Sequence, residues 1–260
     1  IPYIIRRFFH LVPTFLGGTF LAFMITQLVP GDYLTTMAFN PSVKPETIER
    51  MREQFGLNES MWSQYLKWMG NLARGNLGYS FDSNQPVANL LTRPIMNSMI
   101  LVVFSLLLLY AAAVPLGVYA ATRQYSFGDQ LISIVGYFAL AIPSFFFALV
   151  LISLLFALRR FTNDAFGFNE LLFPVAKMTS NNYSNLNVWG KFWDVMWHAL
   201  LPSFVLAFSG IAGLTRVLRG QMLEFLQSDF IRTARAKGLA EGTVTYKHAL
   251  RSAIIPFVAG

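Results

Sequence analysis

The sequence predicts an all-α membrane protein, a polytopic bundle of transmembrane helices. Of its 260 residues, 55% are hydrophobic and only 13% are charged, and the mean hydropathy is +0.48. Four long stretches contain no Asp, Glu, Lys or Arg, and many basic residues lie close to the ends of these stretches. A typical soluble domain carries about 25% charged residues, so the composition of this chain suits lipid better than water.

Each charge-free stretch is long enough to cross a bilayer, because a hydrocarbon core of about 30 Å takes about 20 apolar helical residues. The stretches lie between Arg7 and Asp32, Arg93 and Arg123, Asp129 and Arg159, and Asp194 and Arg216, with apolar centres at 15–29, 99–121, 131–158 and 197–214. A fifth apolar stretch starts at Ser252 and is still short at Gly260. Together with the missing initial Met, this leads us to expect a chain trimmed at both ends.

The first stretch has an alternative interpretation as a cleaved signal peptide, since Arg6 and Arg7 precede it. Its apolar run is longer than the 7 to 15 residues, roughly, of a signal-peptide core, and no obvious small-x-small cleavage site follows. We therefore expect a transmembrane span.

Basic residues near the ends of spans predict the orientation, because short cytoplasmic loops are enriched in Lys and Arg. Arg6 and Arg7 place the N-terminus in the cytoplasm. Four crossings return the chain to the same side after Leu214, and the segment that follows is strongly basic. Its basic residues include Arg216, Arg219, Arg232, Arg235, Lys237, Lys247 and Arg251. The short turn from Arg123 to Asp129 is then cytoplasmic too.

This topology divides the chain into three parts. Residues 1–31 form the cytoplasmic N-terminus and the first span, and residues 32–98 form an external loop. Residues 99–260 form a core with spans two to four and the start of a fifth. Within the core we expect a second external loop at 159–196 and a cytoplasmic loop at 216–251.

Several functions are disfavoured by what the sequence contains. There is no cysteine, so disulfides, iron–sulfur clusters and thiolate zinc sites are excluded, and the three histidines are scattered. The net charge of +7 fits basic cytoplasmic loops better than nucleic-acid binding. The spans hold no ionisable carboxylate, Lys or Arg, which argues against an ion- or proton-coupled carrier, and no cluster of catalytic polar groups, which argues against a membrane-embedded enzyme. These two classes remain the alternatives. Pro115, Pro143 and Pro202 are interpreted as packing kinks in preference to substrate contacts.

Amphipathic helices are expected in the first external loop. Pro45 can start a helix with Ile48, Met51 and Phe55 on one face, and Gly56 can end it. A second run has apolar and aromatic residues at helical spacing. These are Met61, Trp62, Tyr65, Leu66 and Met69. Such a helix suits the membrane interface or the side of a neighbouring span. A packed cap is the simpler interpretation, and a docking surface for an external partner is the alternative.

The segment after the fourth span predicts a short, capped helix. Ser228 or Asp229 can accept hydrogen bonds from the first free N–H groups, and Gly238 can take the left-handed conformation that ends a helix, with Leu239 as the following apolar contact. A second helix is expected from about Glu241 to Leu250. An elbow of two helices between two spans is a lever, although its charges alone are better explained by a simple positive-inside anchor.

Two short motifs lie in this segment. The chain reads Thr-Ala-Arg-Ala-Lys-Gly-Leu at 233–239 and His-Ala-Leu-Arg at 248–251, with Pro256 downstream. These motifs resemble the coupling loop of importer permeases in its peptide and nickel branch, whereas only Ala234, Gly238 and Leu250 fit the general importer signature. Further similarity to that branch lies in the opening and in the external loop, at 3–7, 29–32, 55–57, 64–68, 75–80 and 86–87. Asn76 is a mild departure, since the branch commonly has Asp there.

On these motifs the chain resembles a permease subunit of the ATP-driven (ABC) importers for oligopeptides, dipeptides and nickel, the binding-protein-dependent inner-membrane components. The resemblance implies a type I importer permease fold of about six spans, in a prokaryotic cytoplasmic membrane. It implies a homologous second permease, two ABC ATPase subunits and an external solute-binding protein as partners. Peptides are the expected substrate, with nickel chelates or oligosaccharides as alternatives.

The resemblance also assigns ATP and Mg²⁺ to the ATPase subunits, so that this chain is not an enzyme and carries no cofactor or metal of its own. The absence of a Gly-x-x-x-x-Gly-Lys-Ser/Thr motif agrees with that division. The residues that the resemblance places in ATPase coupling are Asp229, Arg232, Thr233, Ala234, Arg235, Ala236, Lys237, Gly238 and Leu239.

Overall fold

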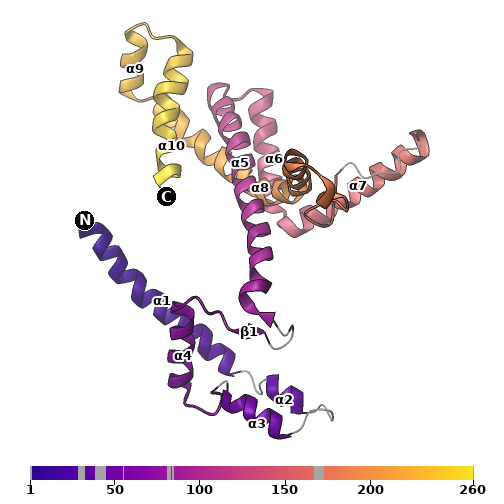
Figure 1. Cartoon of the computed structure of the whole chain (residues 1–260). Helices are drawn as coiled ribbons and strands as arrows, with labels where there is room; N and C mark the ends of the chain where they lie inside the picture. Colours follow the sequence, from indigo (N-terminus) through magenta and orange to yellow (C-terminus); the bar gives the residue numbers. More distant parts are fainter. Residues whose placement is uncertain are drawn as a thin grey trace. The chain divides into compact units, whose positions relative to one another are not determined.

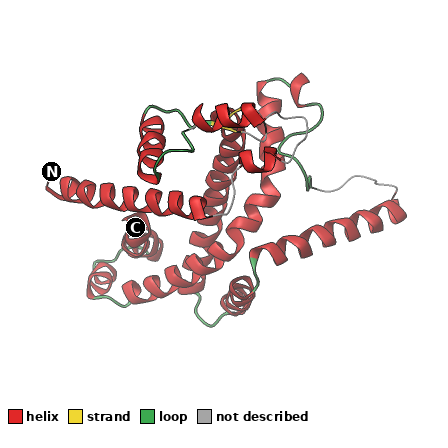
Figure 2. Ribbon diagram, turned by 90° about the horizontal axis from the view of Figure 1, so that it is seen from below, coloured by secondary structure: helices red, strands yellow, loops and turns green. Residues whose placement is uncertain are grey.

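The chain is almost entirely helical in the computed structural model, which describes residues 2–28, 33–38, 45–54, 56–80, 83, 85–166 and 173–259. It forms two compact units, Ile1–Pro94 and Ile95–Gly260. Figure 1 shows the helices in chain order, and Figure 2 shows how little of the described chain is strand. The predicted all-α class is confirmed.

Four helices within the described residues are long and apolar enough to cross a membrane. They lie in α1 (Pro2–Leu28), α5 (Val87–Thr122), α7 (Ser144–Phe166) and α8 (Val188–Leu226). Large apolar side chains such as Leu107 and Leu154 are exposed on them. Such surfaces are unfavourable in water and are expected where the solvent is lipid. The predicted set of four apolar crossings is therefore present.

The third crossing departs from the prediction of one span at 131–158. The chain breaks at Ile142 and Pro143, and forms α6 (Phe127–Ala141) before α7. Proline lacks an N–H and disfavours helical geometry in the residue before it, and Ile142 is extended at φ −89° and ψ 125°. Pro202 lies inside α8 without ending it. The same residue type thus breaks one helix and is accommodated in another.

The long helices extend beyond the predicted apolar centres. With 39 residues, α8 is about 58 Å long at 1.5 Å per residue, which exceeds the thickness of a bilayer. It runs past Arg216 to Leu226, so the first part of the predicted loop at 216–251 is helical. Helix α7 likewise continues past the predicted span, into the loop predicted at 159–196. Residues 167–172 of that loop lie outside the described part of the chain.

The rest of that loop is tied to α8. It contains a short 3₁₀ turn, η1 (Tyr183–Asn185). The Ser180 N–H donates to Asp194 Oδ2 at 2.9 Å, and Lys191 lies over the Tyr183 ring at 5.7 Å. Because both partners belong to α8, these contacts hold the loop on the helix that follows it.

Close packing joins α5 and α8. A Cβ at Gly117 would lie only 3.0–3.2 Å from the side chain of Leu218, which is fully buried. The Ser203 hydroxyl, also fully buried, donates to the Leu101 carbonyl at 3.3 Å. Small residues that let backbones approach, and hydroxyls that bond across helices, are the usual means of joining helices in lipid, where the hydrophobic effect does not act between them.

The first unit contains the predicted amphipathic helices. After α2 (Tyr33–Ala38), helix α3 (Pro45–Gln54) begins at the predicted proline, and Gly56 has the left-handed φ of +67° that a helix end requires. Phe55 and the motif at 29–32 lie outside the described residues. Beyond α4 (Met61–Ala73), the strands β1 (Tyr79–Ser80) and β2 (Gln85–Pro86) form a small antiparallel pair.

Aromatic contacts hold α4 against α1. The ring of Trp62 stacks on Phe20 with centroids 4.8 Å apart. Tyr65 is buried, with its hydroxyl 3.0 Å from Thr19 Oγ1 and 3.2 Å from the Leu16 carbonyl, to which it donates. This matches the expectation of a helix packed against a neighbouring span.

We predict that Gly117→Leu destabilises the second unit, because Leu218 has no free space to move into. Overpacking of this kind costs about 1–3 kcal/mol. Thermal unfolding of the protein in detergent would show a lowered midpoint. Gly18→Leu on the exposed surface of α1 is the matched control, since nothing lies within 4 Å of its Cβ position. Equal midpoints for the two variants would contradict the close packing.

Candidate functional site

The candidate site is the elbow, residues 228–250, which joins α8 to α10 (Leu250–Ala259). It consists of α9 (Asp229–Ala236), a connection through Gly238, and a helical turn with π geometry, η2 (Thr243–Ala249), which continues into α10. Figure 1 shows α9 beyond the end of α8, and α10 turning back from α9 toward α8. The expected second helix is present from Glu241, but it continues through Leu250 without ending there.

The start of α9 differs from the prediction of a side-chain cap. The Ser228 hydroxyl donates to the Phe225 carbonyl of the preceding turn and makes no cap hydrogen bond. The Ser228 carbonyl accepts from the N–H groups of Ile231 and Arg232, each at 3.1 Å. The hydroxyl thus satisfies the end of α8 instead of the beginning of α9, which joins the two helices through a tight turn.

The end of α9 confirms the predicted glycine stop. Gly238 has a φ of +76°, a region that L side chains rarely adopt. Its N–H donates to the Arg235 carbonyl at 2.9 Å, and the Leu239 N–H reaches the Ala234 carbonyl at 3.4 Å. These two bonds satisfy carbonyls that a helix end leaves free, and they turn the chain back toward α10.

One face of the elbow is buried in the bundle. Ile231 is fully buried and Ala234 nearly so, against α8, α5 and the chain returning toward α10. The other buried members of this cluster are Val118, Ala121, Leu218, Met222, Val244, Ala249 and Ala253. Burying an Ile side chain contributes about 1.5–3 kcal/mol, so α9 is seated firmly on its neighbours.

The opposite face of the elbow is exposed. Of the nine residues that the sequence places in coupling, eight are exposed and Ala234 alone is buried. The exposed ones are Asp229, Arg232, Thr233, Arg235, Ala236, Lys237, Gly238 and Leu239. The structure therefore brings the predicted residues together on one surface, and it gives Ala234 a packing position behind that surface.

Ion pairs organise the charges of this surface. Arg235 donates from Nε and Nη2 to the two carboxylate oxygens of Glu241, at 2.8 and 3.2 Å, and so bridges the two arms of the elbow. Arg232 and Asp229 approach at 3.5 Å within α9. Lys237 has no ion pair within the described part of the chain. Exposed pairs contribute only about 0–1 kcal/mol each, so they set orientation more than stability.

A second link connects the end of α8 with the start of α6. Arg219 donates from Nε and Nη2 to Asp129 Oδ1 and Oδ2, at 2.8 and 2.9 Å. The Tyr125 N–H also donates to Asp129 Oδ2 at 2.9 Å. Asp129 lies in the first turn of α6, before its charge-free part, and the Arg219 guanidinium holds the pKa of the Asp129 carboxyl below the ordinary value.

This pair was not predicted from the sequence. In the sequence, Asp129 only marks the start of one charge-free stretch, and Arg219 is one of many basic residues that follow a different stretch. The two residues lie 90 positions apart. The available signal was that opposite charges stand at two span ends predicted to lie on the same side. The pair agrees with that part of the topology, because it places the 123–129 turn level with the end of α8.

The chemistry of the elbow is that of a contact surface. In the described residues, no group of three or more His, Asp or Glu side chains is arranged to hold a metal ion. The exposed face offers short aliphatic, hydroxyl and basic groups on a rigid helix, which suits insertion into a groove on another protein.

Two family descriptions match this chain. "Binding-protein-dependent transport system inner membrane component" matches residues 113–260, and the N-terminal part of the same kind of component matches residues 1–102. The first match includes the whole elbow.

Individual relatives extend over nearly the whole chain. It is 38% identical over 257 residues to the oligopeptide transport system permease protein AppB of Bacillus subtilis, covering 98% of this chain and 76% of the relative. It is 32% identical over 266 residues to the dipeptide transport system permease protein DppB of Escherichia coli K12, covering 99% and 78%. A di/tripeptide permease protein of Pseudomonas aeruginosa is 33% identical over 259 residues, covering 98% and 77%.

We predict that Gly238→Ala destabilises the elbow by about 1 kcal/mol, since alanine is strained at a positive φ. The strain is purely conformational, because nothing lies within 4 Å of its Cβ position. Gly242→Ala is the matched control: it has equally open space but ordinary helical angles, and is expected to be neutral or slightly stabilising. Hydrogen exchange of the α9 amides reports the difference, and equal protection in the two variants would contradict the left-handed stop.

Proposed function

This chain belongs to the family of binding-protein-dependent transport system inner membrane components, and from that premise we propose that it forms part of the translocation pathway of an ATP-driven peptide importer. A permease of this family is a transporter that lies in the membrane with several helical spans. Peptides are proposed as the substrate because the relatives described above are named as oligopeptide, dipeptide and di/tripeptide permeases.

The observation that supports the proposal is that the elbow has one face buried in the bundle and one face exposed. Its inner face, with Ile231 and Ala234, is packed on α8 and α5, and its outer face is exposed. A partner that binds the outer face therefore grips an element that cannot move independently of the bundle. That combination is what a coupling element requires.

We propose that the partner is a cytoplasmic ABC ATPase subunit, which binds ATP and Mg²⁺, and that the nine predicted residues form the contact. Arg235 and Glu241 fix the angle between the arms, while Lys237 and Leu239 present a charge and an apolar side chain on either side of Gly238. A homologous second permease, a second ATPase and an external solute-binding protein complete the proposed importer.

Transport in this proposal is alternating access by rigid-body movement. Closure of the ATPases brings the elbows of the two permeases together. The movement passes into α8 through the buried cluster, and into α6 through the Arg219–Asp129 pair. Two helices of the bundle then tilt as a unit, which couples the nucleotide sites to the pathway.

The proposal is tested by blocking the outer face without disturbing the inner one. Ala236→Trp adds a bulky side chain to an exposed position of α9. We predict that the complete importer loses copurifying ATPase subunits and that peptide uptake into proteoliposomes falls at least tenfold, as expected for the loss of ~1.4 kcal/mol or more of contact free energy.

Gln124→Trp is the matched control for this variant, because Gln124 is exposed in the 123–129 turn at the same end of the second unit. It should insert, assemble and transport normally. If Ala236→Trp retained both its ATPase subunits and wild-type uptake, α9 would not be the docking surface.

The proposed orientation has the N-terminus and the elbow in the cytoplasm, on the distribution of Lys and Arg. The chain has no cysteine, so Lys237→Cys introduces a unique thiol at an exposed position. We predict that a membrane-impermeant maleimide labels it only after the cells are permeabilised. Ser83→Cys in the proposed external loop should label in intact cells. The reverse pattern would overturn the orientation.

A further inference from the structure

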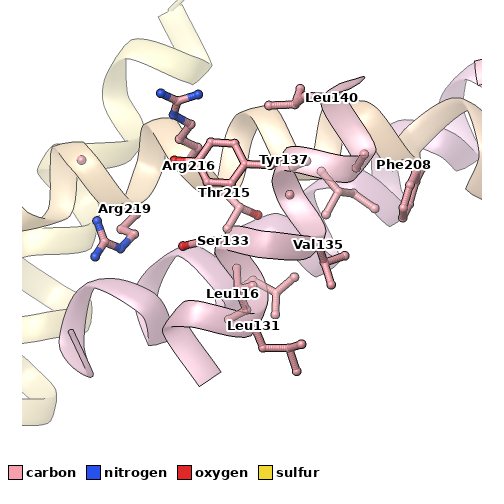
Figure 3. Close-up of a pocket in the computed structure, with 16 residues that line it drawn as sticks. Leu116, Leu131, Ser133, Val135, Tyr137, Leu140, Phe208, Thr215, Arg216 and Arg219 are labelled. Carbon is pink, nitrogen blue, oxygen red and sulfur yellow. The ribbon is translucent and has the colours of Figure 1, made fainter. Parts of the chain in front are cut away.

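An apolar groove runs between α6 and α8, and none of the residues that line it belongs to the elbow. Its volume is about 480 Å³, and its walls are mainly aliphatic, with Leu131 and Val135 on α6 and Ile211 on α8. Glycine and alanine at Gly136, Ala212 and Gly220 contribute almost no side-chain volume, which keeps it hollow. Figure 3 shows Leu140 and Phe208 toward one end and the two arginines toward the other.

The polar end of the groove is basic. Arg216 is exposed and lies over the Tyr137 ring, with its guanidinium carbon 5.6 Å from the ring centroid. Arg219 is engaged by Asp129, so that pair is close to neutral. The described side chains give Arg216 no carboxylate partner, so this end keeps one net positive charge.

The order of side chains along α8 matches the cross-section of a lipid leaflet. The charge-free centre of this helix ends at Leu214, and Arg216 is its first charged residue beyond that point. From Arg216 to Phe208 the helix rises about 12 Å at 1.5 Å per residue. We therefore expect the cation of the groove at the depth of the headgroups and its aliphatic trough within the hydrocarbon region.

We propose that this groove binds an anionic phospholipid, with the headgroup phosphate on Arg216 and one acyl chain between α6 and α8. Basic pockets between transmembrane helices are suited to anionic headgroups, and a guanidinium presents donors in a fork that fits phosphate oxygens. The Tyr137 ring holds the Arg216 side chain at the mouth, which lowers the entropy lost on binding.

A protein segment in the groove is the alternative occupant, and the charge of Arg216 disfavours it. A helix packed over this end would have to bring a carboxylate of its own or leave the guanidinium buried and unpaired, which is costly. A lipid phosphate supplies the compensating charge at that depth. The inference needs only the membrane bundle, so it stands or falls separately from ATPase coupling.

The test compares Arg216→Gln with Arg123→Gln. Arg123 also lies over a tyrosine ring, 5.4 Å from the centroid of Tyr119, but it is not among the residues that line the groove. The complete importer would be reconstituted in nanodiscs of phosphatidylglycerol and phosphatidylcholine, and bound lipid counted by native mass spectrometry after release into detergent. We expect about fivefold weaker retention of phosphatidylglycerol in Arg216→Gln, unchanged retention in Arg123→Gln, and no effect on phosphatidylcholine.

A second variant tests the trough itself. A Cβ at Gly136 would meet only the Ala212 Cβ, at an ordinary contact distance of 3.8 Å. Gly136→Leu should therefore fill the groove without unfolding the bundle and should also reduce phosphatidylglycerol retention. A photoreactive probe on Val135→Cys identifies the occupant directly, since the chain has no other thiol. Adducts to lipid are expected. Adducts to a protein chain, or equal phosphatidylglycerol retention in Arg216→Gln and the unaltered protein, would overturn the proposal.

Discussion

The packing of α9 onto the bundle is the interaction on which the rest of the structure depends. Ile231 and Ala234 are held in one cluster with Leu218 and Met222 of α8 and with the chain that returns toward α10. Without this cluster the elbow would be a flexible basic loop, and its charges would do no more than fix the topology. With it, an exposed surface is joined to two transmembrane helices by contacts that transmit force because a close-packed interior is not easily compressed.

The Arg219–Asp129 pair extends the connection between the elbow and the bundle to a further helix, α6. The cluster joins the elbow to α5 and α8, whereas the pair joins the end of α8 to the start of α6. Both oxygens of the carboxylate are engaged, and the Tyr125 N–H holds the turn from the other side. A displacement of α9 is therefore shared between α8 and α6. Beyond Ile142 the helical hydrogen bonding is interrupted at Pro143, and α7 is joined to α8 instead by the stacked rings of Phe147 and Phe208, whose centroids lie 4.1 Å apart.

Features encoded within a few residues were predictable, and features that depend on distant partners were not. The charge-free stretches predicted the apolar helices because a charge in hydrocarbon is costly, so a span can be recognised in the sequence by the absence of charged residues. Gly238 and Pro45 marked helix ends because their backbone preferences are local. A kink was predicted at Pro143, but not the complete break between α6 and α7, since Pro202 has the same chemistry and leaves α8 intact. The hydroxyl of Ser228 was assigned to the wrong helix because two helix ends compete for it.

The basic residues beyond Leu214 show why topological and functional signals coincide in such a chain. All of them count equally toward a cytoplasmic location, yet the structure gives them different partners. Arg219 binds Asp129, Arg235 binds Glu241, and Arg216 lies over the Tyr137 ring. Charged residues are unfavourable in the hydrocarbon, so they lie at the membrane interface. In that layer they can contact lipid headgroups and cytoplasmic subunits. A residue retained for orientation is therefore already placed to bind a lipid or a partner, and only its neighbours decide which.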